Sequence, residues 1–352
     1  MKIRLKALRD QVIVITGASS GIGLTTARQA AKKGAKLVLA ARSDDALRQL
    51  VDEIGANGGR AIHVEADVGN EADVRRISDA AFREFGGFDT WVNNAGVSVY
   101  GRGVEVSIED MRRVFDTNFW GVVYGSRIAA EHLRRAGGAL INVGSEVSDV
   151  AAPLQAIYSA SKHAVKGWTD ALRMEFEYED APISVTLIKP GPIDTPYTQH
   201  AKNYLPDQPK HAPPVYSPES VAEAILYAAT RPVRDVFVGS GAKLMATMNK
   251  VAPRLADKVV GAVIIPGTHS GRPRDSRDAL HQPSRELRAR GDYPGMVRGS
   301  VYTHAVTHPM VTGALAVGAG LLVSAMWRNQ GDGERQLRSR YRREALTTAQ
   351  GW

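Results

Sequence analysis

The chain has 352 residues, of which 43% are hydrophobic and 23% are charged, and its formal net charge is +8. These fractions are typical of a soluble globular protein with a core of ordinary size. The absence of cysteine excludes disulfide-stabilised folds and thiolate metal sites. Residues 250–352 carry 16 Lys and Arg against 8 Asp and Glu, so the excess charge lies in this part and indicates two functional regions.

The first ten residues, MKIRLKALRD, are basic but lead into only a short apolar run at 12–16. This run lacks the length of the apolar core of a signal peptide, and no small-residue cleavage site follows it. We therefore expect the folded part of the protein to be cytoplasmic.

Seven short apolar runs alternate with amphipathic helical patterns between residues 10 and 240. The runs are almost continuously apolar, as expected for strands that are buried on both faces of a sheet. They lie at residues 12–16, 36–41, 61–66, 90–95, 139–144, 184–189 and 235–239. Repeated strand–helix–strand order predicts an α/β fold, a doubly wound parallel sheet, in one domain at residues 1–249.

A glycine-rich turn, TGASSGIG at 16–23, directly follows the first predicted strand and opens the first predicted helix. Such a turn lets the backbone approach a pyrophosphate, and the free N–H groups and dipole of the helix N-terminus attract it. An ordinary tight turn is the alternative, but the position between a strand and a helix favours a dinucleotide site. The candidate cofactor residues here are Gly17, Ser19, Ser20, Gly21, Ile22 and Gly23.

The end of the second predicted strand carries Arg42 and Ser43, and Ala41 occupies the place where an acidic residue would hold a free ribose 2′-hydroxyl. A guanidinium suits a phosphate dianion through bidentate, charge-assisted hydrogen bonds. We therefore predict NADP(H) rather than NAD(H), although Arg42 could also be a solvated loop residue.

Asp67, with the adjacent Val68, ends the third predicted strand and could accept a hydrogen bond from an adenine amino group. Asp67 could equally cap the helix that comes next, and the two roles do not exclude each other.

Tyr158 and Lys162, in YSASK, are four residues apart at the start of a predicted helix, so their side chains are neighbours. A phenol has an ordinary pKa of about 10, and a neighbouring ammonium favours the phenolate and lowers that pKa. The spacing predicts an acid suited to donating a proton to a carbonyl oxygen during hydride transfer. An exposed surface pair is the alternative.

The motifs together resemble the short-chain dehydrogenase/reductase family over about residues 10 to 240. They are TGASSGIG, NNAG at 93–96, Asn118 in DTNFWG, Ser145 in INVGS, YSASK and KPGPIDT at 189–195. The resemblance implies a Rossmann fold and an oxidoreductase that interconverts a carbonyl and an alcohol, and Arg42 adds the expectation that it depends on NADP(H). The alternative is a dinucleotide-binding scaffold or redox sensor that its C-terminal part recruits to a membrane or partner.

The resemblance also implies a role for each matching residue. Tyr158 would donate and accept the proton, Lys162 would hold the nicotinamide ribose, and Ser145 would hydrogen-bond the substrate oxygen. Asn118 would anchor a water that relays protons to Lys162. Asn94, Ala95 and Gly96 would pack against the cofactor, and Pro190, Gly191, Ile193 and Thr195 would frame its carboxamide. Members of the family are commonly dimers or tetramers, so we expect a homo-oligomer.

Residues 196–220 are rich in proline and polar residues and come after a strand end, where ligands bind in such sheets. We predict a lid over a small carbonyl or alcohol substrate, with Tyr197, Tyr204 and Leu205 as apolar contacts, and a plain surface loop is the alternative. We predict no metal site, because the one suggestive pair, His304 and His308, has no carboxylate near it in the sequence.

Three segments come after the predicted domain. Residues 250–308 are rich in Arg, Pro and Gly and predict a linker or loosely ordered arm. Residues 309–327 predict an apolar helix, and the uncharged stretch 310–327 suits either a membrane anchor or a helix docked on protein. The basic tail 328–352 could meet anionic lipid or be solvated, and without a recognition motif we expect no nucleic-acid partner.

Overall fold

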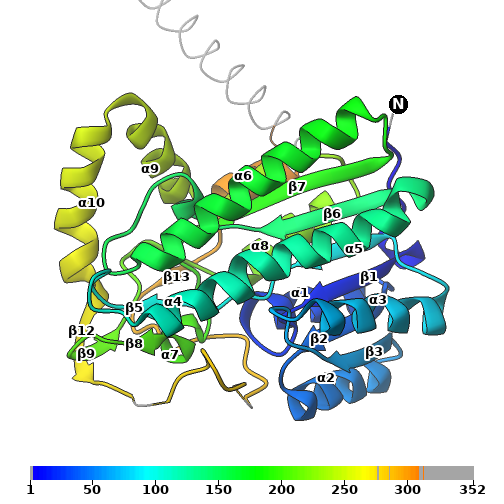
Figure 1. The fold of residues 1–352 in the computed structure, drawn as a ribbon, viewed down its shortest axis with the longest axis horizontal. Helices are drawn as coiled ribbons and strands as arrows, with labels where there is room; N and C mark the ends of the chain where they lie inside the picture. The colour runs from blue at the N-terminus through cyan, green and yellow to red at the C-terminus, as the bar shows by residue number, and fades with distance from the viewer. Residues whose placement is uncertain (1–2, 276, 285, 309–311, 313–352) are drawn as a thin grey trace, which may run out of the picture. The chain divides into compact units, whose positions relative to one another are not determined.

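A computed structural model describes residues 3–275, 277–284, 286–308 and 312. The chain divides into two compact units, residues 1–304 and 305–352. The first unit holds the predicted domain (Figure 1). Of the second unit the structure describes residues 305–308 and Thr312, so the predicted apolar helix at 309–327 and the basic tail at 328–352 lie otherwise outside the described residues.

The first unit is built on a parallel seven-stranded sheet in the order β3-β2-β1-β4-β6-β7-β11. The strands are β1 Val12–Thr16, β2 Lys36–Ala41, β3 Arg60–Glu65, β4 Thr90–Asn93, β6 Gly138–Val143, β7 Ile183–Pro190 and β11 Asp235–Val238. Each overlaps one of the seven predicted runs. The strand order reverses between β1 and β4, which confirms the predicted doubly wound sheet of Rossmann type.

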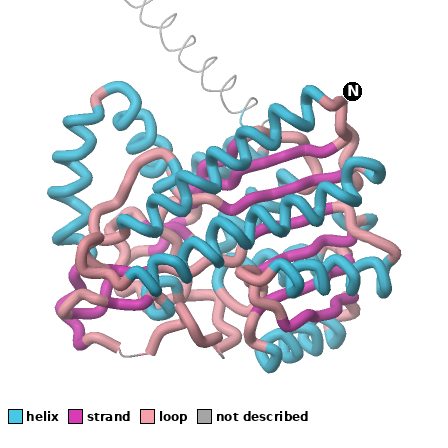
Figure 2. Tube along the Cα trace, viewed as in Figure 1, coloured by secondary structure: helices cyan, strands magenta, loops and turns pink. Residues whose placement is uncertain are grey.

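Helices cover both faces of this sheet (Figures 1 and 2). One apolar cluster joins the sheet to α1 Gly21–Lys32, α2 Asp44–Ala56 and α8 Pro218–Ala228, and the other joins it to α3 Glu71–Phe85, α5 Gly121–Ala136 and α6 Ala156–Tyr178. Because strand side chains alternate between faces, Ile13 and Ile15 of β1 enter the first cluster, whereas Val12 and Val14 enter the second. Both faces are therefore buried, which explains the continuous apolar runs.

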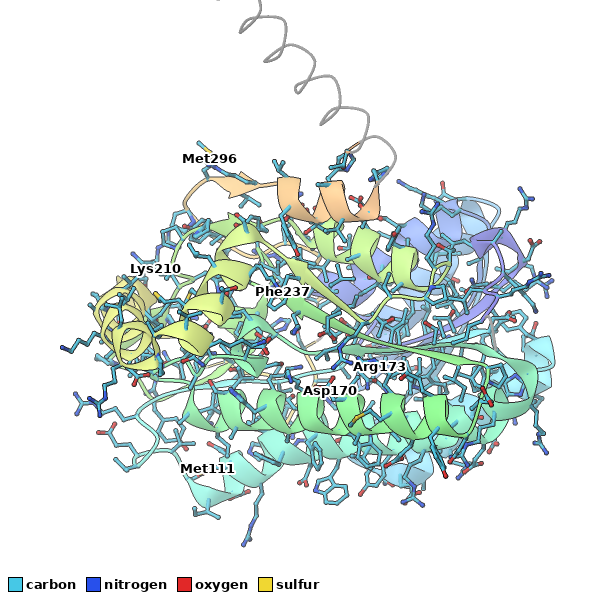
Figure 3. The ribbon with its side chains drawn as sticks, turned by 90° about the horizontal axis from the view of Figure 1, so that it is seen from above. Met111, Asp170, Arg173, Lys210, Phe237 and Met296 are labelled. Atoms are coloured by element: carbon cyan, nitrogen blue, oxygen red, sulfur yellow. The ribbon has the colours of Figure 1, made fainter. Side chains whose placement is uncertain are left out.

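An ion-pair network fixes α6 against the β7–β11 end of the sheet. The nearly buried Arg173 lies 2.7 Å from Asp170 one helical turn earlier, and Figure 3 labels both side chains. The Nε group of Arg173 donates to the Val185 carbonyl of β7 at 3.0 Å. Since α6 carries Tyr158 and Lys162 at its other end, this network helps to fix where the helix presents them.

Short elements surround the carboxyl ends of the strands. They are the 3₁₀ turn Glu146–Ser148, the π-helical turn Asp116–Trp120, β5 Val99–Tyr100, α4 Ile108–Phe115, α7 Tyr197–His200, β8 Lys202–Asn203, β9 Asp207–Pro209 and β10 Val215–Tyr216. A further 3₁₀ turn, Leu8–Asp10, directly precedes β1 and lies at the amino ends of the strands. β5 pairs with β8, so the predicted lid segment at 196–220 is joined to the loop after β4.

The prediction of a linker at residues 250–308 is wrong as far as residue 304, because this part lies in the first compact unit. It contains α10 Pro253–Thr268, β12 His269–Pro273, β13 Val297–Arg298 and the start of α11 Val301–Thr307, and it comes after α9 Ser240–Val251. β12 pairs with β9 and β13 pairs with β10. Backbone pairing holds the stretch after α10, whose composition offers few apolar side chains, and this is why composition alone misjudged it.

Among the residues that the structure describes, no helix is long and apolar enough to cross a membrane.

Candidate active site

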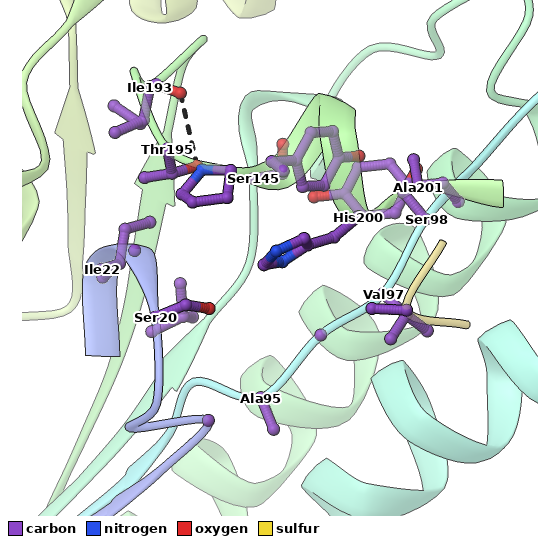
Figure 4. A pocket seen from close by; sticks show the side chains of 18 of the residues that line it. Ser20, Ile22, Ala95, Val97, Ser98, Ser145, Ile193, Thr195, His200 and Ala201 are labelled. Atoms are coloured by element: carbon purple, nitrogen blue, oxygen red, sulfur yellow. Dashed lines mark hydrogen bonds between the residues drawn. The ribbon is translucent and has the colours of Figure 1, made fainter. Parts of the chain in front are cut away.

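One cavity lies at the carboxyl ends of the strands and brings the predicted site residues together (Figure 4). Of the candidate catalytic and cofactor residues, Gly23 and Asn118 do not line it. Those that line it are Gly17, Ser19, Ser20, Gly21, Ile22, Arg42, Ser43, Asp67, Val68, Asn94, Ala95, Gly96, Ser145, Tyr158, Lys162, Pro190, Gly191, Ile193 and Thr195.

The glycine-rich turn is shaped by close backbone contacts. A Cβ on Gly17, whose φ is +66°, would lie 2.7 Å from the Cα of Ala95, and a Cβ on Gly23 would lie 2.1 Å from the Gly17 carbonyl oxygen. Gly23 is therefore needed for packing rather than for contact with the cavity. Among the described residues, no acceptor faces the backbone N–H of Ile22, which lines the cavity, so the start of α1 keeps this donor free for an anion.

We expect Gly23→Ala to lower the free energy of unfolding by about 1–3 kcal/mol, because the added methyl overlaps backbone that cannot move aside. NADPH affinity should fall with it. Gly167→Ala on α6 is the matched control, since nothing lies within 4 Å of its Cβ position, and it should stabilise the helix by about 0.5–1 kcal/mol. Thermal unfolding and NADPH titration check both variants, and equal stability of the two would contradict the packing role.

Arg42 and Asp67 lie at one end of the cavity, and both have protein partners. Arg42 Nη1 donates to the Leu280 carbonyl at 2.9 Å, and Nη2 donates to the Ala279 carbonyl at 2.5 Å. Asp67 Oδ2 accepts from Arg113 Nη2 at 2.6 Å. Asp67 does not cap the next helix, because Asn70 is the N-cap of α3. Arg42 is partly buried and binds two backbone carbonyls, so it is not a solvated loop residue.

Burial lowers the pKa of Arg42, and the positive charge of Arg113 lowers it further. The pKa of Asp67 is also lowered, although burial alone would raise it, because Arg113 and the Gly69 amide donate to it and both arginines attract its charge. At this end of the cavity the Arg42 guanidinium and the Asp67 carboxylate line the wall, and the Arg113 guanidinium contacts Asp67 from behind it.

Tyr158 and Lys162 lie on one face of α6, as predicted, and Lys162 Nζ is 5.8 Å from the centre of the Tyr158 ring. The ammonium donates to the Val143 carbonyl at 2.8 Å, and burial lowers its pKa to about 8. Lys162 thus remains mostly charged near neutral pH.

The sequence predicted that the Lys162 ammonium lowers the pKa of Tyr158, but Lys162 is not among the groups that shift this pKa. Burial raises the pKa of Tyr158, hydrogen bonds with Tyr197 and Ser145 oppose that rise, and the charge of Glu146 adds to it. The lid tyrosine and the serine hydroxyl therefore favour the phenolate, and Lys162 reaches a backbone carbonyl instead. Helical spacing correctly predicted that the two residues share a face of the helix, but it could not predict which group the flexible Lys162 side chain contacts.

Ser145 and Asn118 both make structural hydrogen bonds. Ser145 Oγ accepts from the Val147 amide at 3.3 Å and so caps the turn after β6. Asn118, fully buried in the π-helical turn, accepts from the Val97 amide at 2.8 Å and donates to the Val97 carbonyl at 3.0 Å. A Cβ on Gly96 would lie 3.4 Å from Asn118 Oδ1 and 3.8 Å from Lys162 Nζ, so Asn118 lies beside the ammonium across this glycine.

Of the three lid residues predicted to contact the substrate, one lines the cavity. Tyr197 lines the cavity, its ring lies 5.5 Å from that of Tyr158, and its hydroxyl accepts from Gln155 Nε2 at 2.8 Å. Tyr204 instead donates to Asp110 at 2.6 Å, and Leu205 packs with Tyr100 and Ala201.

The sequence interpretation missed several residues of the cavity. Glu146 comes directly after Ser145, Gln155 precedes Tyr158 by three residues, and His200 extends its imidazole into the cavity (Figure 4). Ala279, Pro283 and Ser284 come from the segment that was predicted to be a linker. Adjacency to Ser145 was a usable signal for Glu146, whereas the other contacts arise from tertiary packing.

His304 also differs from expectation, because a carboxylate is near it: Glu223 Oε1 lies 3.5 Å from His304 Nδ1. Glu223 is on α8, 81 positions earlier in the chain, so no local pattern indicated this contact.

Burial raises the pKa of Glu146 from 4.5 to about 7. The unfolded chain therefore loses this proton at lower pH than the folded one, and the free energy of unfolding falls as pH rises through that window. We expect Glu146→Gln, which cannot ionise, to stabilise the fold by about 2–3 kcal/mol near pH ~8 and far less near pH ~4. Thermal melts across pH test this, with the exposed Glu175→Gln on α6 as control, and a pH-independent gain would contradict it.

The fold and cavity match a known family. A sequence profile described as short chain dehydrogenase matches residues 11–205, and the chain therefore belongs to the short-chain dehydrogenase family. It is 51% identical over 323 residues to the uncharacterized oxidoreductase YxnA of Bacillus subtilis strain 168, which covers 90% of this chain and 91% of that protein.

Two solved structures resemble the fold at 27% sequence identity. A short chain dehydrogenase/reductase from Burkholderia phymatum in complex with NAD has a TM-score of 0.63 and covers 72% of this chain and 96% of its own. An alcohol dehydrogenase from the archaeon Thermococcus sibiricus complexed with 5-hydroxy-NADP has a TM-score of 0.58 and covers 65% and 95%. The chain is thus an oxidoreductase of a family whose members use NAD or NADP.

Proposed function

We propose that this chain is an NADP(H)-dependent oxidoreductase that interconverts a carbonyl and an alcohol, with Tyr158 as general acid and base. The observation that carries the proposal is the Tyr158–Ser145 hydroxyl pair at the cavity wall. In the same cavity, the Ile22 amide at the start of α1 has no acceptor among the described residues and could donate to a dinucleotide phosphate. Hydride transfer to a carbonyl requires a proton-donating hydroxyl and a bound dinucleotide in one cavity, and these two groups of residues would supply both.

The residues of this chain handle the proton and the developing charge. The nicotinamide, when bound, would supply or accept the hydride. In carbonyl reduction Ser145 Oγ would hold the carbonyl oxygen, and Tyr158 Oη would donate its proton to that oxygen as charge develops there. The hydrogen bond from Tyr197 to Tyr158 then stabilises the phenolate that remains. The buried ammonium of Lys162 adds positive charge beside the pair.

The preference for NADP(H) is supported by the charges at the Arg42 end of the cavity. Arg42 and Arg113 stand beside one carboxylate, Asp67, in a partly buried setting. An additional anion is the ligand that such a surplus of positive charge favours, and a 2′-phosphate dianion would supply it.

The walls beyond Tyr158 support an apolar ketone, aldehyde or secondary alcohol as the substrate class. Tyr100, Tyr197, Ala212 and Ile264 line this part of the cavity. Tyr100 is fully buried against Tyr197, and burial raises the pKa of both phenols, so they present rings and neutral hydroxyls.

The experiment that tests the proposal is a panel of ketones and aldehydes assayed by loss of NADPH absorbance. Turnover of apolar carbonyls, faster with NADPH than with NADH, is the expected result. If no carbonyl is reduced while NADPH still binds, the chain acts as a dinucleotide-binding scaffold or sensor.

We also propose a homo-oligomer in the cytoplasm, with no nucleic-acid partner. The α9–α10 hairpin exposes Leu244, Val251, Leu255 and Val263 by half or more, an apolar face that suits contact between copies. Light scattering on the purified chain tests the oligomer.

Membrane contact through residues 310–327 stays a prediction. Comparing how much of the full chain, and how much of a chain that ends at residue 308, binds to membranes tests it.

A further inference from the structure

Residues 278–284 and 286–291, here called the strap, run along the cavity from the lid to the glycine-rich turn. At one end Asp278 pairs with Lys202 of β8 at 3.2 Å, and the Ala279 amide donates to the His200 carbonyl of α7 at 2.8 Å. At the other end the Arg288 carbonyl accepts from the Gly21 amide at 2.9 Å. The strap is therefore a fixed wall of the cavity.

The middle of the strap is anchored through Leu280 and His281. The Leu280 side chain is fully buried with Val99, Val106 and Val114. His281 Nε2 lies 2.7 Å from Asp110 of α4. These contacts fix the direction of the Leu280 carbonyl, which is the group that the arginines bind.

Two guanidinium groups meet at this one carbonyl oxygen. Arg42 Nη1 donates to it at 2.9 Å and Arg113 Nε donates to it at 3.1 Å. Arg113 also binds Asp67 at 2.6 Å and is mostly buried, with 17% of its side chain exposed. Like charges held this close repel each other, and Asp67 offsets one of them. A carbonyl and a carboxylate thus hold two cations in place before any ligand arrives.

Arg42 keeps capacity for a ligand in this arrangement. A guanidinium has five N–H donors, and the two strap carbonyls use two of them. Arg42 lines the cavity, whereas Arg113 lies behind it and does not. Arg113 would therefore act through Arg42 and Asp67 rather than touch the ligand itself.

We propose that the strap is part of the cofactor site and that Arg113 is a positioning residue, which together orient Arg42 toward the adenosine 2′-phosphate of NADP(H). Arg113 pairs with the Asp67 carboxylate and offsets its charge, which would otherwise repel the phosphate. The strap thereby helps to select the phosphorylated cofactor. The inference rests on the NADP(H) dependence proposed above.

The test compares dissociation constants for NADPH and NADH in the full chain, by titration of protein fluorescence, for wild type and three variants. Arg113→Met keeps an apolar stem and removes the charge. Leu280→Ala loosens the strap at its buried anchor. Arg112→Met, at an exposed neighbouring position of α4, is the matched control.

We expect Arg113→Met to weaken NADPH binding about tenfold, which corresponds to the loss of one charge-assisted contact between Arg42 and the phosphate. NADH affinity should stay within about twofold of wild type. Leu280→Ala should shift the ratio of the two constants in the same direction, and Arg112→Met should leave it unchanged. A merely structural role would weaken both cofactors equally, and that result would overturn the inference.

The same measurements separate the two proposals. Equal affinity of the wild type for NADPH and NADH would defeat the proposed NADP(H) dependence and the inference with it. A wild-type preference for NADPH that Arg42→Asp removes but Arg113→Met and Leu280→Ala retain would defeat the inference alone.

Discussion

Replacing Tyr158 by Phe should lower turnover in carbonyl reduction by about 10²- to 10⁴-fold, the range that a positioned general acid contributes. The ring stays in place, so its packing against Tyr197 at 5.5 Å between ring centres is kept. Only the proton donor is lost. Steady-state kinetics with the best carbonyl of the panel measures the effect.

NADPH affinity of Tyr158→Phe should stay within about threefold of wild type, because the Arg42 end of the cavity, where we propose that the phosphate binds, is unchanged. Tyr178→Phe is the matched control, since this tyrosine lies at the end of α6 with 93% of its surface exposed. A Tyr158→Phe variant with wild-type turnover would remove Tyr158 from the role of acid.

Arg42→Asp should weaken NADPH binding about 100-fold, since it replaces charge-assisted hydrogen bonds to a dianion by repulsion. NADH, which has no 2′-phosphate, should lose only a few fold, and an acid at this position could even accept from its ribose hydroxyl. Titration of each cofactor measures the ratio.

Arg48→Asp makes the same charge change on α2, where Arg48 is exposed and paired with Asp44 at 2.6 Å. This control should alter both cofactor affinities little. If Arg42→Asp weakens NADPH and NADH equally, Arg42 serves only to bind the Ala279 and Leu280 carbonyls.

The sequence was sufficient for the sheet and for gathering most of the candidate catalytic and cofactor residues at one cavity. Buried parallel strands leave continuous apolar runs, and the predicted residues meet because the carboxyl ends of parallel strands lie along one edge. Tyr158 and Lys162 needed only helical spacing to share a face of α6. These features depend on residues close together in the chain or on periodicity.

Features that depend on long-range contacts were not predictable. The strap binds Arg42 from 237 and 238 positions away, and no local pattern marks a backbone carbonyl as an acceptor. The pKa of Tyr158 depends on burial and on Tyr197, 39 positions later in the chain. Composition misjudged residues 250–304 because hydrogen bonds and ion pairs, rather than apolar burial, hold much of that segment.

The most direct test of the central claim is mass spectrometry of the alcohol formed from an apolar ketone and NADPH deuterated at the transferable position. We expect one deuterium on the carbinol carbon for each NADPH that the wild type consumes, and almost no labelled alcohol from Tyr158→Phe. Labelled alcohol from Tyr158→Phe at the wild-type rate, or NADPH consumption that leaves the ketone unreduced, would contradict it.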